Sequence, residues 1–199
     1  MKVLMNITNQ YYSENALDFF SSTVNVDVQK LYEQFLPHVP KRGKILDAGC
    51  GSGRDSKSFL DLGYEVTSLD ANESLAKLAE EYLGQKVVVA TFDSFEAAPG
   101  TFDAIWACAS LLHVPINKLP MTFNHLSQVL KSGGVFYCSF KYGDIEQVRN
   151  GRLFSDLNET KLANILISSP LCISQTWVTS DARPGRESEK WLNAILTKK

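Results

Sequence analysis

The sequence lacks three features that would assign it to a distinct class of proteins. Its four cysteines are widely spaced over 199 residues and form no Cys-x-x-Cys pair, so neither a disulfide scaffold nor a cysteine-rich metal site is indicated. It has no apolar run of the roughly 18 residues that a membrane helix needs, and the first residues are not apolar enough for a signal peptide. It has no basic excess, with 20 Lys and Arg against 22 Asp and Glu. We therefore expect a protein of the reducing cytoplasm that binds neither membranes nor nucleic acid.

What is present is the composition of an ordinary globular domain. Hydrophobic residues make up 44% of the chain and charged residues 21%, and the length suits one domain. Residues 1–24 are polar with paired aromatic residues, and helical spacing of apolar residues begins only after Asn25. We predict a cap or lid segment over 1–24 and a single domain over 25–199.

Strand-like and helix-like segments alternate through the middle of the chain. The predicted strands cover 44–48, 65–70, 86–90, 102–107 and 135–140, and the predicted helices between them cover 54–62, 72–83 and 119–130. This alternation indicates right-handed crossovers and a parallel sheet covered on both faces. After a helix over 156–167, the segments 172–179 and 190–197 have no helix between them and predict a hairpin. We expect an α/β, Rossmann-like, doubly wound sheet of seven mostly parallel strands, closed at one edge by an antiparallel C-terminal hairpin strand.

The turn after the first predicted strand carries the chemistry. It reads Asp47-Ala48-Gly49-Cys50-Gly51-Ser52-Gly53, whereas a dinucleotide fingerprint would read G-x-G-x-x-G. An acidic residue before the glycines repels a diphosphate and suits a positively charged ligand. Asp70 ends the second predicted strand, where a carboxylate accepts the hydroxyls of a ribose. Arg54 and Asp55 open the next helix and are interpreted as a solvated face.

Four motifs, in order, resemble those of class I S-adenosylmethionine-dependent methyltransferases. They are Ile45–Gly53, Leu69-Asp70-Ala71, Phe102–Trp106 and Leu130-Lys131-Ser132-Gly133-Gly134. Within that family, Tyr11-Tyr12 and Leu111–Pro115 resemble the small-molecule methyltransferases grouped with tellurite-resistance proteins. The resemblance implies S-adenosylmethionine as the cofactor and no metal.

The resemblance also implies roles for individual residues. Asp47, Ala48 and the backbone of Gly49 and Gly51 would surround the methionine portion of the cofactor. Asp70 would hold the ribose, with Ala71, Phe92 and Asp93 around the adenine. Ala107 and Cys108 would lie beneath the sulfonium. Tyr11 and Tyr12 are expected either to form a lid over the cofactor or to pack on the sheet edge.

Other residues are candidates for work on the acceptor. His113 follows the fourth predicted strand and would either deprotonate an acceptor or shape the pocket. Cys108 has no proline before it, which argues against covalent catalysis. Four further residues would face the substrate side and favour an anionic acceptor: Lys141, Tyr142, Arg152 and Arg183.

The predicted function is methyl transfer to a small molecule, which is either a soft thiol or metalloid anion or a carboxylate or amine metabolite. A monomer or a homodimer is expected. Two alternatives remain open: a non-catalytic module that binds the same cofactor as a sensor or scaffold, and a nucleotide-dependent oxidoreductase.

Overall fold

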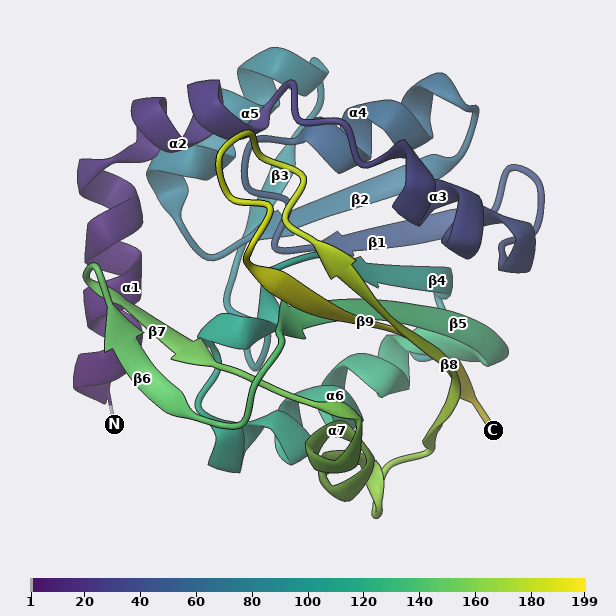
Figure 1. The fold of residues 1–199 in the computed structure, drawn as a ribbon. Coiled ribbons are helices and arrows are strands. Elements are labelled where there is room, and N and C mark those ends of the chain that lie inside the picture. The colour runs from purple at the N-terminus through teal and green to yellow at the C-terminus, as the bar shows by residue number, and fades with distance from the viewer. Residues whose placement is uncertain (1) are drawn as a thin grey trace.

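A seven-stranded sheet forms the centre of the molecule (Figure 1). The computed structural model describes residues 2–199, with side chains from residue 7 onward. The strand order is β3-β2-β1-β4-β5-β9-β8. The strands are β1 (Lys44–Ala48), β2 (Glu65–Asp70), β3 (Val87–Val89), β4 (Phe102–Ala107), β5 (Leu130–Lys141), β8 (Leu171–Ser180) and β9 (Lys190–Lys198). The predicted Rossmann-like, mostly parallel sheet is confirmed.

The C-terminal hairpin occupies one side of this sheet, in a slightly different order from the one expected. β9 is antiparallel to β5 from Val135↔Thr197 to Lys141↔Trp191, and β8 pairs with the outer side of β9. The antiparallel strand therefore lies one position inside the edge.

Helices cover both faces of the sheet. Figure 1 shows α3 (Gln29–Phe35) and α4 (Arg54–Asp61) on one side and α6 (Leu119–Val129) and α7 (Glu159–Leu166) on the other. α5 (Glu73–Leu83) follows β2, and three short 3₁₀ helices, η1 (Leu36–His38), η2 (Leu111–His113) and η3 (Ile116–Lys118), lie in connections. Each face has its own core, since neighbouring strand residues such as Ile45 and Leu46 point to opposite sides.

An aromatic cluster holds α3 and α4 against the sheet. Trp106 of β4 stacks on Tyr137 of β5 with ring centroids 3.9 Å apart, and Phe35 and Phe59 pack on the same indole. All four side chains are fully buried. Burial of one such side chain contributes about 1.5–3 kcal/mol. This packing fixes the end of β4 relative to the turn that leads into α4.

Two parts of the fold have no counterpart among the predicted elements. Residues 2–23 form the helices α1 (Lys2–Glu14) and α2 (Ala16–Thr23), although their apolar spacing predicts none. β6 (Glu146–Arg149) and β7 (Arg152–Ser155) form a separate antiparallel hairpin. Its turn residues Asn150 and Gly151 have φ values of 48° and 74°. Asn-Gly is the preferred sequence for such a turn, so this dipeptide could have predicted the hairpin.

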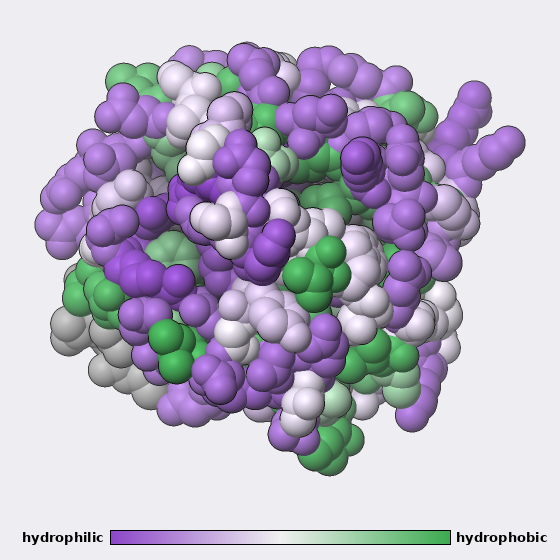
Figure 2. All heavy atoms as spheres, viewed as in Figure 1, coloured by the Kyte–Doolittle hydropathy of each residue, from purple (hydrophilic) through white to green (hydrophobic). Residues whose placement is uncertain are grey.

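The described surface is mainly polar. The face in Figure 2 is mostly hydrophilic, and apolar residues appear on it in small separate groups. No helix within residues 2–199 combines the length and the apolar character needed to cross a membrane.

Candidate active site

A cavity of about 480 Å³ lies at the carboxyl ends of the parallel strands. This volume lies within the ~300–1,000 Å³ that small-molecule sites usually occupy. Its walls come from α1 and α2, from the loops after β1, β2, β3 and β4, from the β6–β7 hairpin, and from the loop between β8 and β9. The order of the strands reverses between β1 and β4, and ligands of such sheets bind at that point.

The glycine turn forms one wall of this cavity. Gly49 and Gly51 have φ values of 88° and 55°, which L residues with a side chain rarely adopt. A Cβ at Gly49 would lie 2.4 Å from the Cβ of Ser110, and one at Gly51 would lie 3.2 Å from the ring of Phe19. The Ser110 hydroxyl donates to the carbonyl oxygen of Ala48 over 2.6 Å. The turn therefore needs glycine to pack between the loop after β4 and α2, and its backbone lines the cavity.

Asp70 connects the glycine turn with the end of β2. Its Oδ2 accepts a hydrogen bond from the backbone N–H of Gly51, and its Oδ1 accepts one from that of Asn72, each over 2.8 Å. Burial raises the pKa of Asp70, while these backbone N–H groups act in the opposite direction. Each oxygen keeps a second lone pair for a ligand hydroxyl. Asp70 and the exposed Ala71 both line the cavity, and their roles toward the ribose and the adenine stay predictions.

Phe92 and Asp93 form the adjoining wall. Phe92 is half-buried, and its ring lies 3.5 Å from the position of a Cβ on Gly49. Asp93 is exposed, and its Oδ1 accepts a hydrogen bond from the Thr91 hydroxyl over 2.6 Å. Both residues line the cavity. An apolar ring beside an exposed carboxylate can contact the face and the amino group of a purine.

Asp47 lies behind the glycine turn instead of at the cavity mouth. Its carboxylate is 2% exposed and accepts a hydrogen bond from the Ser56 hydroxyl over 2.6 Å. Burial, together with the nearby charge of Asp55, raises its pKa. Asp47, Ala48 and Ala107 are buried and are not among the residues that line the cavity. Their roles toward a cofactor stay predictions.

Arg54 and Asp55 are part of the interior, so their interpretation as a solvated face is wrong. Asp55 is 6% exposed and accepts hydrogen bonds from the Tyr32 hydroxyl over 2.6 Å and the Trp106 indole over 2.8 Å. Arg54 donates to both of its oxygens, over 2.6 and 2.9 Å. Burial alone would raise the pKa of Asp55, but these donors outweigh it and hold that pKa low. The aromatic cluster supplies this burial, which the polar sequence Arg54-Asp55-Ser56 does not reveal.

His113 and Tyr12 meet on the opposite wall. His113 Nδ1 lies 2.6 Å from the carbonyl oxygen of Leu153, which can only accept, so Nδ1 carries the proton. Nε2 therefore accepts the bond from the Tyr12 hydroxyl, 2.9 Å away. Burial lowers the pKa of His113 to about 4. The ring is neutral at pH 7 with both nitrogens engaged, and its role as a base stays a prediction.

The other two predicted site residues on this side differ in position. Tyr11 does not line the cavity, and its ring instead lies 4.4 Å from the guanidinium of Arg152. Cys108 lines the cavity, with the Ser139 hydroxyl 3.9 Å from its sulfur. Burial raises the pKa of Cys108 to about 12, so the thiol is protonated at neutral pH. This agrees with the argument against covalent catalysis.

The expected substrate side is partly formed. Lys141, Arg152 and Arg183 line the cavity, whereas Tyr142 is exposed outside it. Lys141 and Arg183 both bind Asp181, over 3.0 and 2.6 Å, and these donors offset the effect of burial and depress the pKa of Asp181.

Several cavity residues are absent from the predicted set: Asn9, Phe19, Asn72, Ser110, Trp191 and Asn193. The loop between β8 and β9 also forms part of the cavity wall. Its charged run Ser180–Arg186, between two predicted strands, is the sequence signal for that part of the wall. Within the described residues, no group of three or more His, Cys, Asp or Glu side chains could hold a metal ion.

Comparison with known proteins identifies the fold and its domain. Residues 46–138 match the methyltransferase domain family. The chain is 32% identical over 118 residues to the sterol 24-C-methyltransferase of Candida albicans, covering 53% of this chain and 30% of that protein. It is 33% identical over 91 residues to the malonyl-[acyl-carrier protein] O-methyltransferase of Pseudescherichia vulneris, covering 45% and 36%.

A solved structure extends the similarity over almost the whole chain. The Burkholderia thailandensis 1,6-didemethyltoxoflavin-N1-methyltransferase, with 1,6-didemethyltoxoflavin and S-adenosylhomocysteine bound, superposes with a TM-score of 0.80. It is 18% identical and covers 97% of this chain and 88% of that one. Residues 46–138 thus match a methyltransferase domain, and the chain as a whole has the fold of that solved enzyme. It spans less than half the length of the relatives that it matches in sequence.

The residues of this methyltransferase domain fit S-adenosylmethionine. The backbone of the Gly49–Gly51 turn lines the cavity, and the Asp70 carboxylate beside it has lone pairs for two hydroxyls. Phe92 supplies an apolar surface on the next loop. The fit agrees with the predicted cofactor and with an enzyme of this class.

Proposed function

We propose that the protein transfers a methyl group from S-adenosylmethionine to a small-molecule acceptor. The observation that carries this proposal is the bond between the Gly51 N–H and Asp70, which joins the glycine turn to a carboxylate on the next strand within one cavity. Asp70 would hold the ribose hydroxyls, Ala71, Phe92 and Asp93 the adenine, and the glycine turn the methionine portion. Asp47 would support that turn from behind, where it accepts a hydrogen bond from Ser56 of α4.

The protein's part in the reaction is mainly orientation. The cofactor, when bound, supplies a methyl group already activated on a sulfonium. The chain has to exclude water and to align the acceptor, and alignment can contribute up to ~7–11 kcal/mol. Phe19 over Gly51 and Tyr12 over the opposite wall would exclude water. Cys108, as a neutral thiol, would contribute surface and no nucleophile.

His113 enters this proposal first as a positioning residue. Its tautomer is set by Leu153, and it fixes the Tyr12 hydroxyl. A proton from a weakly acidic acceptor would reach Nε2 only through that hydroxyl. Deprotonation by His113 is therefore proposed only for acceptors that bind next to Tyr12.

The identity of the acceptor cannot be transferred from the relatives. By their names, they methylate carbon, oxygen and nitrogen in unlike molecules. We keep a soft thiol, a metalloid anion, a carboxylate and an amine in the proposal. The proposal also includes a likeness to tellurite-resistance methyltransferases. It includes a lid over residues 1–24 and a domain over 25–199, a cytoplasmic location, and a monomeric or homodimeric state.

Binding and turnover test this function. In calorimetry, we expect S-adenosylhomocysteine to bind and NAD not to bind. Asp70→Asn should lower the affinity for S-adenosylhomocysteine about 10- to 100-fold, because a hydrogen bond to a charged group is lost. Asp103→Asn is the matched control, because Asp103 pairs with Lys131 at the opposite end of β4 and does not line the cavity. NAD binding alone would defeat the proposal.

The second test separates an enzyme from a binding module. A labelled methyl donor is incubated with the protein and with thiols, metalloid oxyanions, carboxylic acids and amines. Transfer to a member of this panel supports the enzyme. Tight binding of S-adenosylhomocysteine with no transfer to any member favours the sensor or scaffold.

A further inference from the structure

Arg152 differs from the other arginines of the cavity wall. Arg54 pairs with Asp55, Arg183 with Asp181, and Arg186 with Glu189. Arg152 has no acidic partner among the described side chains. Its Nε atom is buried and has no hydrogen-bond partner there either. A buried charged donor without an acceptor is costly, unless a ligand supplies that acceptor.

Aromatic rings hold the Arg152 guanidinium in place. Its Cζ lies 4.4 Å from the ring centroid of Tyr11, 5.3 Å from that of Phe154 and 5.8 Å from that of Tyr12. Such contacts engage the face of a guanidinium and leave the N–H groups on its edge for other partners. Arg152 is thus positioned without being neutralised.

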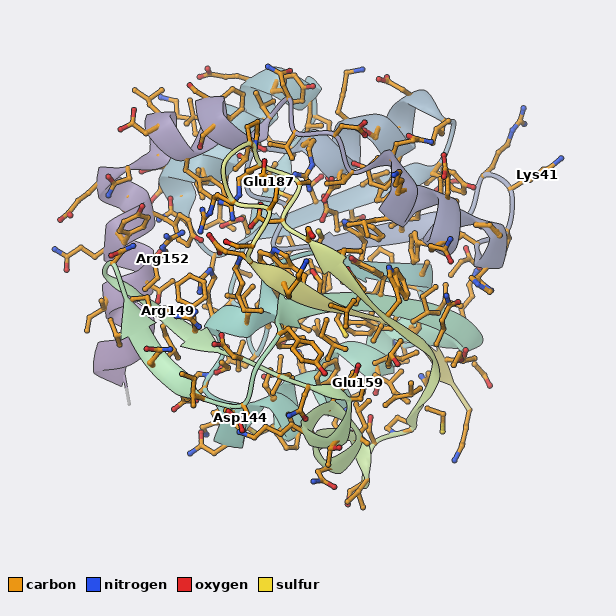
Figure 3. All side chains as sticks on the ribbon, viewed as in Figure 1. Lys41, Asp144, Arg149, Arg152, Glu159 and Glu187 are labelled. Atoms are coloured by element: carbon orange, nitrogen blue, oxygen red, sulfur yellow. The ribbon has the colours of Figure 1, made fainter. Side chains whose placement is uncertain are left out.

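A second arginine on the same hairpin shows the contrast. Arg149 is the register partner of Arg152 across the Asn150-Gly151 turn, and Figure 3 labels both arginines on this hairpin beside α1. Arg149 also lies over Phe154, with its Cζ 4.6 Å from the centroid. Its Nε is likewise buried without a hydrogen-bond partner, but Arg149 forms an ion pair with Asp156 and does not line the cavity. The hairpin therefore carries one neutralised arginine outside the cavity and one free arginine in its wall.

We propose that Arg152 binds an oxyanionic group, a carboxylate in the simplest case, of the small molecule that this protein methylates. This inference rests on the proposed function, and it names the substrate class. The planar fork of a guanidinium matches a carboxylate with two parallel N–H···O bonds. Anchoring the acceptor through an oxyanion would fix the distance of its reactive atom from the end of β4.

The position of Arg152 favours the acceptor over the carboxylate of the methyl donor. Arg54, which begins α4 directly after the glycine turn, is the arginine on the donor's side of the cavity, and it is paired with Asp55. Arg152 belongs to the opposite wall, where Phe154 packs on His113 with centroids 5.1 Å apart. The two arginines thus serve different parts of the cavity.

The test compares acids with their amides on the S-adenosylhomocysteine-loaded protein. The probes are benzoate and benzamide, nicotinate and nicotinamide, and 3-mercaptopropionate and 3-mercaptopropionamide, titrated by calorimetry. At least one acid should bind more tightly than its amide. Arg152→Gln should lower the affinity for that acid about 10- to 100-fold, and Arg152→Lys should lower it less. Neither variant should change the affinity of the amide, and Arg149→Gln should leave both affinities unchanged.

The possible failures are distinguishable. S-adenosylhomocysteine is titrated first, and if it does not bind the wild type, the proposed function itself fails. If it binds and no acid exceeds its amide, only the role of Arg152 is overturned. If Arg152→Gln instead lowers the affinity for S-adenosylhomocysteine as strongly as the affinity for the acid, Arg152 holds the donor and the inference is wrong. Thermal unfolding of each variant verifies that it is folded.

Discussion

Asp47, Asp55 and Asp70 lie in one region of the fold, and different donors hold each carboxylate. Asp55 accepts four hydrogen bonds from three side chains, which saturates both of its oxygens. Asp47 accepts one from Ser56 and is closed off from the cavity. Asp70 accepts two from the backbone and still faces the cavity with unused lone pairs. Of these three carboxylates, Asp70 is therefore the one prepared for the hydroxyls of a ligand.

The sequence predicts these carboxylates unequally. Asp70 follows a strand directly, and the end of a strand fixes its place at the cavity. Asp47 is predicted to surround the methionine portion of the cofactor, but its side chain is buried against Ser56 of α4 and does not line the cavity. The burial of Asp55 depends on Trp106 and Tyr32, which are distant in sequence, so no local pattern could reveal it.

His113 gives a prediction on pH. Its pKa of about 4 in the folded protein lies below the ordinary value of about 6.5. Between pH 6.5 and about 4, the unfolded chain binds a proton at His113 that the folded chain does not bind. The contribution of His113 to the unfolding free energy is therefore fully present above pH 6.5 and falls as the pH decreases to about 4. Between pH 7.5 and 5, this linkage removes up to about 2 kcal/mol of unfolding free energy. Urea unfolding at both pH values should show a smaller loss for His113→Gln than for the wild type.

The same variant tests the base hypothesis. His113→Gln should leave the affinity for S-adenosylhomocysteine nearly unchanged. Turnover that survives over the whole pH range would exclude His113 as a base. An equal pH-dependent loss of stability in both proteins would mean that the ring is not buried in its neutral form.

The β6–β7 hairpin is the element that most changes the expected site. It brings Arg152 and Phe154 to the cavity, and Leu153 orients His113. Its turn also contacts α1, because a Cβ at Gly151 would lie 3.3 Å from Cδ2 of Tyr11. The hairpin and α1 therefore position each other.

Gly151→Ala tests this contact. Gly151 has a φ of 74°, so an alanine there is expected to cost about 1 kcal/mol of unfolding free energy. Gly84→Ala is the matched control, since Gly84 has a φ of 69° and no atom within 4 Å of its Cβ position. Both variants should lose similar stability in urea unfolding, but only Gly151→Ala should accelerate hydrogen exchange over residues 8–14. Equal exchange in the two variants would contradict a positioning contact.

The elements that the sequence predicts well are those with a regular apolar pattern. β4 has the predicted bounds, and α6 ends within one residue of its predicted end. β5 begins at Leu130, earlier than predicted, because a register shift against β4 lets the glycine-containing turn continue as strand. α1 escapes prediction because polar side chains supply several of its attachments to the rest of the fold. Asn9 and Ser13 bind Asn72, and Thr8 binds the Leu153 N–H.

At the scale of the whole molecule, α1 spans the cavity from one wall to the other. On the β2 side, Asn72 Nδ2 donates to the Asn9 carbonyl, the Asn9 side chain and the Ser13 hydroxyl, over 3.0, 2.7 and 2.9 Å. On the hairpin side, the Leu153 N–H donates to the Thr8 hydroxyl over 3.0 Å. Tyr12 lies between these attachments and points to His113. Because α1 forms part of the cavity wall, opening either attachment would widen the exit for a bound ligand.

Loosening the attachment to Asn72 should therefore speed the release of the cofactor product. The double variant Asn9→Ala, Ser13→Ala removes two of the three bonds of Asn72 Nδ2, each contributing about 0.5–1.5 kcal/mol. We expect S-adenosylhomocysteine to dissociate about tenfold faster in stopped-flow measurements, and hydrogen exchange over α1 to accelerate in the ligand-free protein. Ser22→Ala is the control, because the Ser22 hydroxyl bonds only within its own exposed segment. If dissociation accelerates while exchange in the ligand-free protein does not, Asn9 acts on the ligand directly and α1 is no gate.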